Sequence, residues 1–367
     1  MKVCFLVSNL KSGGVERTVC YVSKYFAHHG VTTTILSLSD EIFYDVDEKV
    51  NLVSLHIDRG YDNKIQKYSR IFRRLTGVKK HIKSEEYDAV FCMAPEMTRY
   101  VLSLHNKLSF KLISSERNNP LFDNIRDKRV KGKAFSECDG IVFQTKRAME
   151  CFPAEIQKKG IIIPNAVGNE LAYTINKEKR TTKKIVAVGR LTKQKDYPTL
   201  IKAFKIVHSI FPQEKLEIYG SGEDEKNLKR LCHEQGIEKH VDFMGNSKEV
   251  LKLIANSDCF VLSSIYEGMP NVLMEAMAIG LPCISTDCPF GPRELIENRI
   301  NGFLVPVGDS EELAQSIIYV LNNKEESERI GERAKTILKT HNMEEISSQY
   351  LEYVKAIVGD KNDFEQI

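Results

Sequence analysis

Two glutamates eight positions apart are the residues best suited to chemistry in this sequence. Glu267 and Glu275 lie in the run SSIYEGMPNVLMEAMAIGLPCIS. Pro270 suits the first position of a helix and Gly280 the position just past its end, so the spacing predicts a helix from about Met269 to Ile279. Amide groups in its first turn would face an anion such as a diphosphate. Because a phosphate repels carboxylates, we expect both glutamates to accept hydrogen bonds from ribose or sugar hydroxyls, which indicates a nucleotide sugar.

The surroundings of this helix decide between two interpretations. Two glutamates on a helix are more often a solvated face than a site. Here, however, the apolar runs Cys259–Leu262 and Leu281–Ile284 flank the helix and are typical of buried parallel strands. The motif is therefore expected at a strand-to-helix turn, where doubly wound sheets bind ligands.

Two cations follow another apolar run. Arg190 and Lys195 come just past the predicted strand Lys184–Val188 and near a helix start. Paired cations at such a place would offset the negative charge that grows on a diphosphate leaving group. The alternative is an ordinary surface loop, but the position at a strand end favours the functional interpretation.

Two further stretches could bind anions. The pair Gly13-Gly14 follows the first predicted strand and opens a helix, which lets the backbone approach a phosphate. A plain glycine turn stays an open alternative there, since the pattern is not G-x-G-x-x-G. The stretch Lys64–Lys83 carries eight Lys or Arg and no acid on an amphipathic helix. Such a helix either lies on an anionic membrane or polyphosphate, or is simply a solvated face. The cations expected to make such a contact are Lys67, Arg70, Arg73 and Arg74.

Composition limits the class of protein. With 367 residues the chain is long enough for two domains, and its net charge of +3 is small. Most of the nine cysteines lie in apolar settings, as in a reduced cytoplasmic protein. No pair of Cys or His residues suggests a metal site, and no apolar run is long enough to span a membrane. The short apolar start of the chain is expected to be a strand rather than a signal peptide. We expect no nucleic-acid partner.

Short apolar runs alternate with helical patterns, which predicts an α/β protein with parallel sheets. The polar stretch Asn169–Lys184 separates two such series, so we expect two doubly wound domains, residues 1–168 and 169–342, with a ligand cleft between them. The apolar stripe of Met343–Val358 must dock on another element. The expected strands are Lys2–Ser8, Thr33–Leu38, Ala89–Met93, Lys111–Ser115, Gly140–Gln144 and Gly160–Pro164, then Lys184–Val188, Lys215–Tyr219, Val241–Met244, Cys259–Leu262, Cys283–Ser285 and Gly302–Val305.

These motifs, in this order, resemble glycosyltransferase family 4, the retaining sugar-nucleotide transferases with the GT-B fold. The resemblance covers nearly the whole chain. It is carried by Gly13–Arg17, Ile163–Val167, Val188–Leu191 with Lys195, Glu267–Pro270, Glu275–Pro282 and Asn301–Val305. It implies two Rossmann-like domains and a last helix, about residues 343–367, that crosses back to the first domain.

The resemblance also implies roles for matched residues. Glu267, Arg190 and Lys195 would be catalytic: the two cations would hold the donor diphosphate, and Glu267 would contact the donor sugar. Glu275 would bind the ribose. Gly13 and Gly14 would let the first domain close on the diphosphate, and Glu116 would lie on the donor side. The remaining donor contacts would come from Gly268, Met269, Pro270, Asn271 and Val272.

One position departs from the family pattern. Many members carry a His near the donor sugar where this chain has Arg117, which cannot act as a base but can bind a phosphate or a sugar oxygen. The basic stretch Lys64–Lys83 is similar to helices in relatives that extend sugars linked to polyprenyl diphosphate, which implies such an acceptor here.

The sequence therefore predicts a retaining glycosyltransferase. It would move a hexose or N-acetylhexosamine from a nucleotide sugar, with UDP as the expected carrier, to a growing lipid-linked surface glycan, without metal or cofactor. We expect it in the cytoplasm, at the inner face of the membrane. Two alternatives stay open: a sugar-nucleotide epimerase of the same architecture, and a non-catalytic sugar-nucleotide binder.

Overall fold

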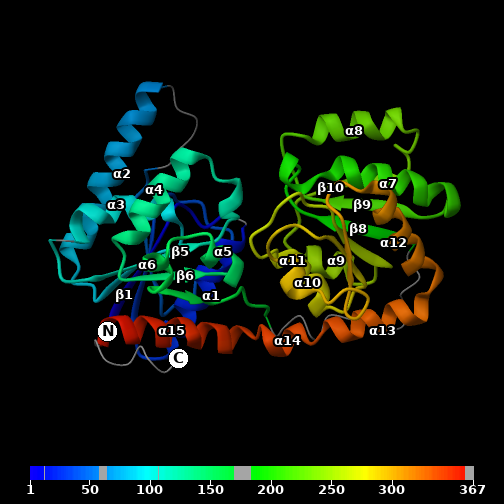
Figure 1. Ribbon diagram of the computed structural model, residues 1–367. Coiled ribbons are helices and arrows are strands. Elements are labelled where there is room, and N and C mark those ends of the chain that lie inside the picture. Colours follow the sequence, from blue (N-terminus) through cyan, green and yellow to red (C-terminus); the bar gives the residue numbers. More distant parts are fainter. Residues whose placement is uncertain (12, 58–63, 106, 169–182, 360–367) are drawn as a thin grey trace. The chain divides into compact units, whose positions relative to one another are not determined.

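The computed structural model of the chain divides into two compact units (Figure 1). It describes residues 1–11, 13–57, 64–105, 107–168 and 183–359. Unit 1 comprises Met1–Ala166 and Met343–Ile367, and unit 2 comprises Val167–Asn342. The expected boundary after residue 168 thus lies two residues from this division, and the expected boundary after residue 342 coincides with it. The predicted linker Asn169–Lys184 lies outside the described residues except for its last two.

Unit 1 is built on a parallel sheet whose strand order is β3-β2-β1-β4-β5-β6-β7. The chain leaves β1 in one direction for β2 and β3, then returns to the other side of β1 with β4. The strands are β1 (Lys2–Val7), β2 (Thr32–Ser37), β3 (Asn51–Ser54), β4 (Ala89–Cys92), β5 (Lys111–Glu116), β6 (Gly140–Phe143) and β7 (Gly160–Ile162). Strand β3 was not predicted; it is a half-exposed edge strand with no apolar run to reveal it.

Helices cover both faces of this sheet. Successive side chains of β1 point to opposite faces of the sheet. Val3, Phe5 and Val7 share one face and join the core beneath α1 and α15. The ring centroids of Phe5 and of Phe26 in α1 are 5.3 Å apart. Helices α2, α3 and α4 form a second, contiguous layer. The helical elements of unit 1 are α1 (Gly14–His28), α2 (Lys64–Ser84), α3 (Pro95–His105), η1 (Pro120–Phe122), α4 (Ile125–Ser136), α5 (Lys146–Glu150), α6 (Ala154–Gln157) and α15 (Met343–Gly359).

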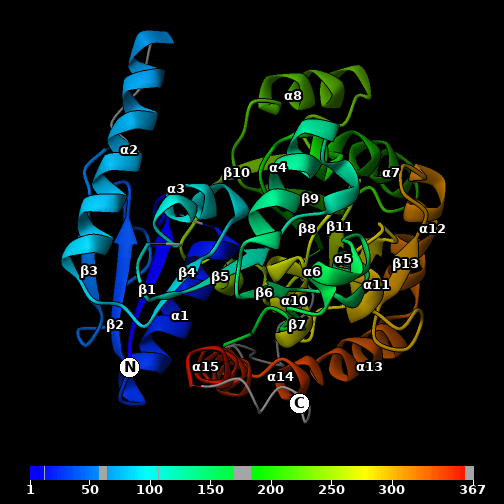
Figure 2. The ribbon, with the colours of Figure 1, turned by 60° about the vertical axis from the view of Figure 1, so that its left-hand side comes forward.

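The C-terminal helix α15 belongs to unit 1, where Figures 1 and 2 show it beside α1. Its predicted apolar stripe is buried, with Tyr350 and Val354 fully so. Tyr353 adds specific contacts, because its hydroxyl donates to the Lys159 carbonyl (2.6 Å) and accepts from the Ile141 amide (2.8 Å). The last helix therefore docks through both packing and hydrogen bonds.

Unit 2 has its own parallel sheet, in the order β10-β9-β8-β11-β12-β13. Here too the chain starts in the middle, at β8, and later returns to its other side with β11. The elements of unit 2 are β8 (Lys184–Val188), η4 (Lys193–Lys195), α7 (Tyr197–Ile210), β9 (Lys215–Tyr219), α8 (Glu225–Glu234), β10 (Val241–Gly245), α9 (Val250–Ile254), β11 (Cys259–Leu262), α10 (Asn271–Ala278), β12 (Cys283–Thr286), α11 (Pro292–Leu295), β13 (Phe303–Val305), α12 (Ser310–Asn322), α13 (Lys324–Ala334) and α14 (Ile337–Thr340).

Each sheet therefore has a point where the strand order reverses: between β1 and β4 in unit 1, and between β8 and β11 in unit 2. In doubly wound sheets, ligands bind beyond the carboxyl ends of the strands at this point.

Among the described residues, no helix is both long and apolar enough to cross a membrane.

Candidate functional site

The two chemistry-bearing motifs of unit 2 meet at its reversal point. Lys195 follows β8 and Glu267 follows β11, and these two strands are neighbours in the sheet although the residues are 72 positions apart. The Lys195 Nζ lies 2.6 Å from Oε1 of Glu267, and both side chains are nearly buried, with 12 % and 8 % of their surface exposed. A charge removed from water requires a partner, and each of these two residues provides the partner of the other.

Glu267 is fixed by a second donor. The Ser264 hydroxyl also donates to Oε1, at 2.6 Å. Both contacts reach the same oxygen, so Oε2 accepts no hydrogen bond from the residues that the structure describes. The second oxygen is thus available to a hydroxyl donor while the first is held by protein.

Backbone contacts fix the two loops that carry this pair. The Ile265 amide donates to the Gln194 carbonyl (2.8 Å), and the Gln194 side chain donates to the Tyr266 carbonyl (3.0 Å). Ser263 donates to the Lys195 carbonyl (2.7 Å), and Thr286, at the end of β12, donates to the Ser264 carbonyl (2.6 Å). These positioning residues were not predicted, because each acts through a contact with a distant part of the sequence.

The other two predicted residues of this site differ in exposure. Arg190 is exposed and donates to the Gln194 side chain at 3.3 Å, so it stands at the rim. Glu275 lies within α10 and is 8 % exposed. The structure therefore supplies one deep cation, one rim cation and two nearly buried carboxylates on elements that follow β8 and β11.

Helix α10 begins two residues later than predicted. Pro270 is its N-cap rather than its first residue, and the helical hydrogen bonds start with the Leu273 amide, which donates to the Pro270 carbonyl (3.1 Å). Residues Gly268, Met269 and Pro270 thus form the approach to the helix, and Asn271 and Val272 begin its first turn, where amide groups can meet an anion. The end is as predicted: Gly280 has a φ of +76°, and the Leu281 amide donates to the Ala276 carbonyl (3.0 Å).

A glycine from another loop supports this approach. Gly291, before α11, has a φ of +83°, a conformation that favours glycine. A Cβ at this position would collide with the Gly268 carbonyl and lie 2.6 Å from Cδ of Pro270. Position 291 must therefore be glycine for the 268–270 backbone to keep its path.

Two neutral groups line the Lys195–Glu267 pair. Burial and, to a smaller extent, the Glu267 charge raise the pKa of the Tyr197 hydroxyl, which donates to the Gly189 carbonyl (3.0 Å). Burial, with a smaller contribution from Glu267, raises the pKa of Cys288 to about 12, so this thiol stays neutral.

Within the described residues, no three His, Cys, Asp or Glu side chains come together in a way that could hold a metal ion.

The predicted residues of unit 1 lie at the equivalent edge of its own sheet. Gly14 is the first residue of α1 and Gly13 its N-cap. The Tyr44 hydroxyl contacts both the amide (3.3 Å) and the carbonyl (3.2 Å) of Gly13, which fixes the turn after β1. A Cβ on Gly13 would meet the end of the Glu16 side chain.

Glu116 is buried at the end of β5 in a cluster of three charges. Lys131 of α4 lies 2.9 Å from Glu116 and 2.8 Å from Asp123, at ion-pair distance though without hydrogen-bond alignment. Burial raises the pKa of Glu116, and the nearby Asp123 adds to the rise while Lys131 opposes it. The sequence pattern does not distinguish Lys131 from other lysines, since only the fold brings it to β5.

Arg117 is largely buried and connects three parts of unit 1 by hydrogen bonds. Its guanidinium donates to Asn165 (2.9 Å), to Thr18 of α1 (3.4 Å) and to the Tyr350 hydroxyl of α15. Only 8 % of the residue is exposed. Nη1 and Nη2 thus connect three parts of unit 1, whereas Nε makes no hydrogen bond within the described residues, and the hypothesis that Arg117 binds a phosphate or sugar oxygen stays a prediction.

The basic stretch forms helix α2 as predicted, but its cations differ in exposure. Arg73 is exposed, Arg70 is half-buried, and Arg74 donates to the Tyr100 hydroxyl of α3 at 3.3 Å. The side chain of Lys67 lies outside the described part of the chain. Phe72 is 68 % exposed, next to Arg73 in the sequence.

Comparison with known proteins places the chain in a family. The model of the family "Glycosyl transferases group 1" matches residues 172–337. An "Uncharacterized glycosyltransferase" of Haemophilus influenzae is 30% identical over 354 residues, which cover 95% of this chain and 98% of the relative. The chain belongs to the group 1 glycosyltransferases. The resemblance drawn from the sequence is thereby confirmed, and with it an activity in glycosyl transfer.

One further sequence match and one solved structure extend the comparison of this glycosyltransferase. A Campylobacter jejuni protein named "GalNAc-alpha-(1->4)-GalNAc-alpha-(1->3)-diNAcBac-PP-undecaprenol alpha-1,4-N-acetyl-D-galactosaminyltransferase" is 23% identical over 97% of this chain and 99% of its own. The crystal structure of Anabaena HepE in complex with UDP and glucose has a TM-score of 0.81 at 18% identity, covering 97% of this chain and 100% of HepE. That likeness confirms the predicted GT-B fold.

The role of Gly291 gives a test of the site's packing. Gly291→Ala should lower the free energy of unfolding more than Gly308→Ala does, by roughly 1–3 kcal/mol. Gly308 is a matched control, since its φ is +78° but a Cβ there would have nothing within 4 Å, so it reports backbone strain alone. Urea denaturation measures the difference. Equal losses in the two variants would mean that Gly291 does not support the 268–270 backbone.

Proposed function

We propose that this glycosyltransferase is a retaining family 4 enzyme. It moves a hexose or N-acetylhexosamine from a nucleotide sugar, with UDP as carrier, to a growing lipid-linked surface glycan. In this proposal Lys195 and Arg190 hold the donor diphosphate, Glu275 binds the ribose and Glu267 contacts the donor sugar. The backbone from Gly268 to Val272 lines the site between sugar and phosphate.

The observation that carries the proposal is the Lys195–Glu267 pair at the reversal point of the unit 2 sheet. A diphosphate beside Lys195 would draw the ammonium group partly away from Glu267, and Oε2 of Glu267 would accept a hydrogen bond from a sugar hydroxyl. As the sugar–phosphate bond breaks, negative charge grows on the phosphate, next to Lys195 and Arg190. These two cations supply the charge that a metal ion would otherwise provide, so we propose that transfer needs no metal.

Support for the donor and acceptor comes from relatives. The HepE structure holds UDP and glucose, and a Staphylococcus aureus TarM structure of the same fold holds UDP. The Campylobacter jejuni relative is named for transfer to a glycan on undecaprenyl diphosphate. A lipid-linked acceptor would place the enzyme on the inner membrane surface. Phe72, Arg73 and Lys80 are all exposed on α2, which suits such a contact.

Two other functions are less well supported. A sugar-nucleotide epimerase needs acid and base groups around the donor sugar, whereas Lys195 and Glu267 pair with each other and are assigned here to the diphosphate and the donor sugar. A non-catalytic binder would bind UDP without breaking the donor. Slow donor hydrolysis in the absence of acceptor distinguishes a transferase from such a binder.

Substitutions at the unit 2 site test the assigned roles. Glu275→Ala should raise the Kd for UDP by roughly 10- to 150-fold, because it removes charge-assisted hydrogen bonds to the ribose. Glu267→Ala should leave that Kd nearly unchanged and lower kcat, and Lys195→Ala should lower kcat by roughly 10²–10³-fold. Calorimetry with UDP, and transfer from UDP-hexoses and UDP-N-acetylhexosamines to a polyprenyl-diphosphate-linked glycan with EDTA present, measure these effects.

A second ion pair in unit 2, with a buried carboxylate, provides the control. Glu217 lies 2.6 Å from Lys184 and is 5 % exposed, but Lys184 begins β8, at the opposite edge of the sheet. Glu217→Ala should therefore cost stability without changing kcat. The assigned roles are wrong if Glu267→Ala and Glu275→Ala both keep near-normal kinetics, and the metal-free proposal is wrong if EDTA abolishes transfer and Mg²⁺ restores it.

The proposed membrane contact has its own test. The double variant Arg73→Glu/Lys80→Glu should lose salt-sensitive binding to anionic liposomes and raise KM for the lipid-linked acceptor, while the Kd for UDP is unchanged. Each cation near an anionic surface contributes about 1 kcal/mol. The control Lys226→Glu/Lys239→Glu makes the same change in net charge at exposed positions of unit 2. Normal liposome binding and acceptor kinetics in the α2 variant would show that its cations only solvate a packed helix.

A further inference from the structure

A hollow on unit 2 is separate from the site described above. It measures about 340 Å³ and lies between α12, the edge strand β13 and the loop before that strand. None of its lining residues takes part in the Lys195–Glu267 site. Its size falls near the lower end of the range of about 300–1,000 Å³ that is usual for small-molecule sites. The residues that define it are Arg299, Glu312, Gln315, Ser316, Tyr319 and Asn322.

An aromatic platform forms part of the hollow. Tyr319 is 39 % exposed, and its ring centroid lies 5.6 Å from that of Phe303, with the ring planes at 61°. Phe303 itself is 5 % exposed and belongs to the core beneath α12. The core thus holds Tyr319 from one side while part of its ring stays open to a ligand, an arrangement that suits a partner with an apolar face.

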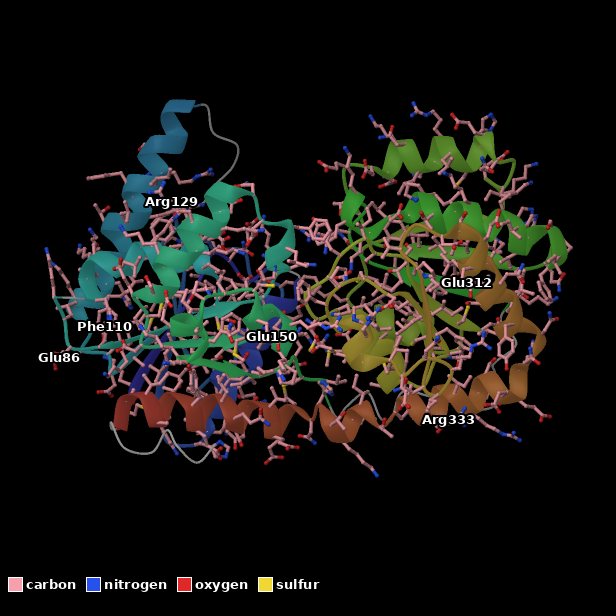
Figure 3. The ribbon with its side chains drawn as sticks, in the orientation of Figure 1. Glu86, Phe110, Arg129, Glu150, Glu312 and Arg333 are labelled. Atoms are coloured by element: carbon pink, nitrogen blue, oxygen red, sulfur yellow. The ribbon has the colours of Figure 1, made fainter. Side chains whose placement is uncertain are left out.

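Polar groups of α12 surround the platform. Gln315 and Asn322 lie four residues before and three residues after Tyr319, so all three share one face of the helix. Glu312, labelled in Figure 3, continues this face toward the start of the helix. Among the residues that the structure describes, Glu312 and Gln315 have no side-chain hydrogen bond or ion pair, so their amide and carboxylate groups stay available.

The loop before β13 completes the rim with a cation. Arg299 has a φ of +66°, which is uncommon for a residue with a side chain. The loop is held by inward contacts: the Arg299 amide donates to the Gly302 carbonyl (2.7 Å), and the Leu304 amide donates to the Asn298 side chain (3.0 Å). Within the described part of the chain, the guanidinium makes no ion pair with Glu312, although both residues line the same hollow. A strained residue on a fixed loop is a reason to expect a function there.

We propose that this hollow is a saccharide-binding subsite, distinct from the donor site. A sugar ring offers an apolar C–H face to Tyr319 and hydroxyl groups that both donate to Glu312 and Gln315 and accept from Arg299 and Gln315. A phosphate or other anion would meet Glu312, and an apolar ligand would leave the polar rim unpaired. The choice of a glycan as ligand rests on the proposed function; the hollow and its polar rim do not. A second contact would raise the effective concentration of a long acceptor chain at the enzyme.

The absence of tryptophan from the chain permits a direct test. Tyr319→Trp keeps an aromatic platform and introduces a single indole at the hollow. Titration with hexoses, N-acetylhexosamines and their disaccharides should give a saturable change in emission, with a Kd on the order of 1 mM. Adding Gln315→Ala should weaken binding about fivefold or more, because one side-chain hydrogen-bonding group is lost. Ile210→Trp places an equally unique indole at an exposed position of unit 2, outside the hollow, and should show no saturable change.

The unmodified protein provides the second measurement. Saturation-transfer-difference NMR should detect the same saccharides on the wild type, and Tyr319→Ala should abolish the signal. Glu311→Ala, on the same helix but outside the hollow, should keep it. Tyr319→Ala should also raise KM for a long acceptor at least severalfold while the Kd for UDP and the kinetics with a short acceptor are unchanged.

The outcomes separate this inference from the proposed function. If saccharides give no saturable signal with either protein, or if Tyr319→Ala leaves the signal intact, the subsite is refuted even when UDP binds and transfer proceeds. If saccharides bind at Tyr319 but UDP does not bind at all, the subsite stands and the proposed UDP donor falls.

Discussion

A buried ion pair is the constraint on which the candidate site of unit 2 depends. Lys195 and Glu267 each lie largely out of water, where the two opposite charges stabilise each other. Their partnership requires β8 and β11 to be neighbours, which in turn requires the chain to leave β8 on one side and return on the other. The reversal of strand order is thus the feature that converts two distant motifs into one site.

The same pair shows how one arrangement can serve both folding and binding. Ser264 and Lys195 hold Oε1 of Glu267, while Gln194, Ser263 and Thr286 fix the loops that carry the pair. The site is therefore pre-organised by residues that need not touch a ligand. In the proposed function, a diphosphate would bind to Lys195, which is already in position, and would replace Glu267 as the partner of its ammonium group.

Local patterns allowed most of the elements to be predicted. Apolar runs bounded by turns identified the strands that are buried in each sheet, and only β3 escaped, since a short half-exposed edge strand has no such run. Gly280 marked the end of α10 because a left-handed residue there favours glycine. Pro270 was predicted as the first helical residue but is the N-cap, one position earlier in the helix nomenclature. Proline is compatible with both positions, and only the backbone dihedrals distinguish them.

Long-range contacts account for what could not be predicted. Gly291 supports the 268–270 backbone from another loop, and Lys131 reaches Glu116 from α4. Arg117 matched a family position expected to face the donor, and its Nη1 and Nη2 donate to Asn165, Thr18 and Tyr350. In each case the residue type was visible in the sequence, but its partner is set by how the strands and helices pack.

The measurement that most directly tests the central claim is a crystal structure of the chain with UDP. The account predicts the diphosphate within hydrogen-bond distance of Lys195 Nζ and the Arg190 guanidinium, and the ribose hydroxyls on the Glu275 carboxylate. UDP bound elsewhere, or bound at this edge of the sheet without contacting Lys195 and Arg190, would contradict it.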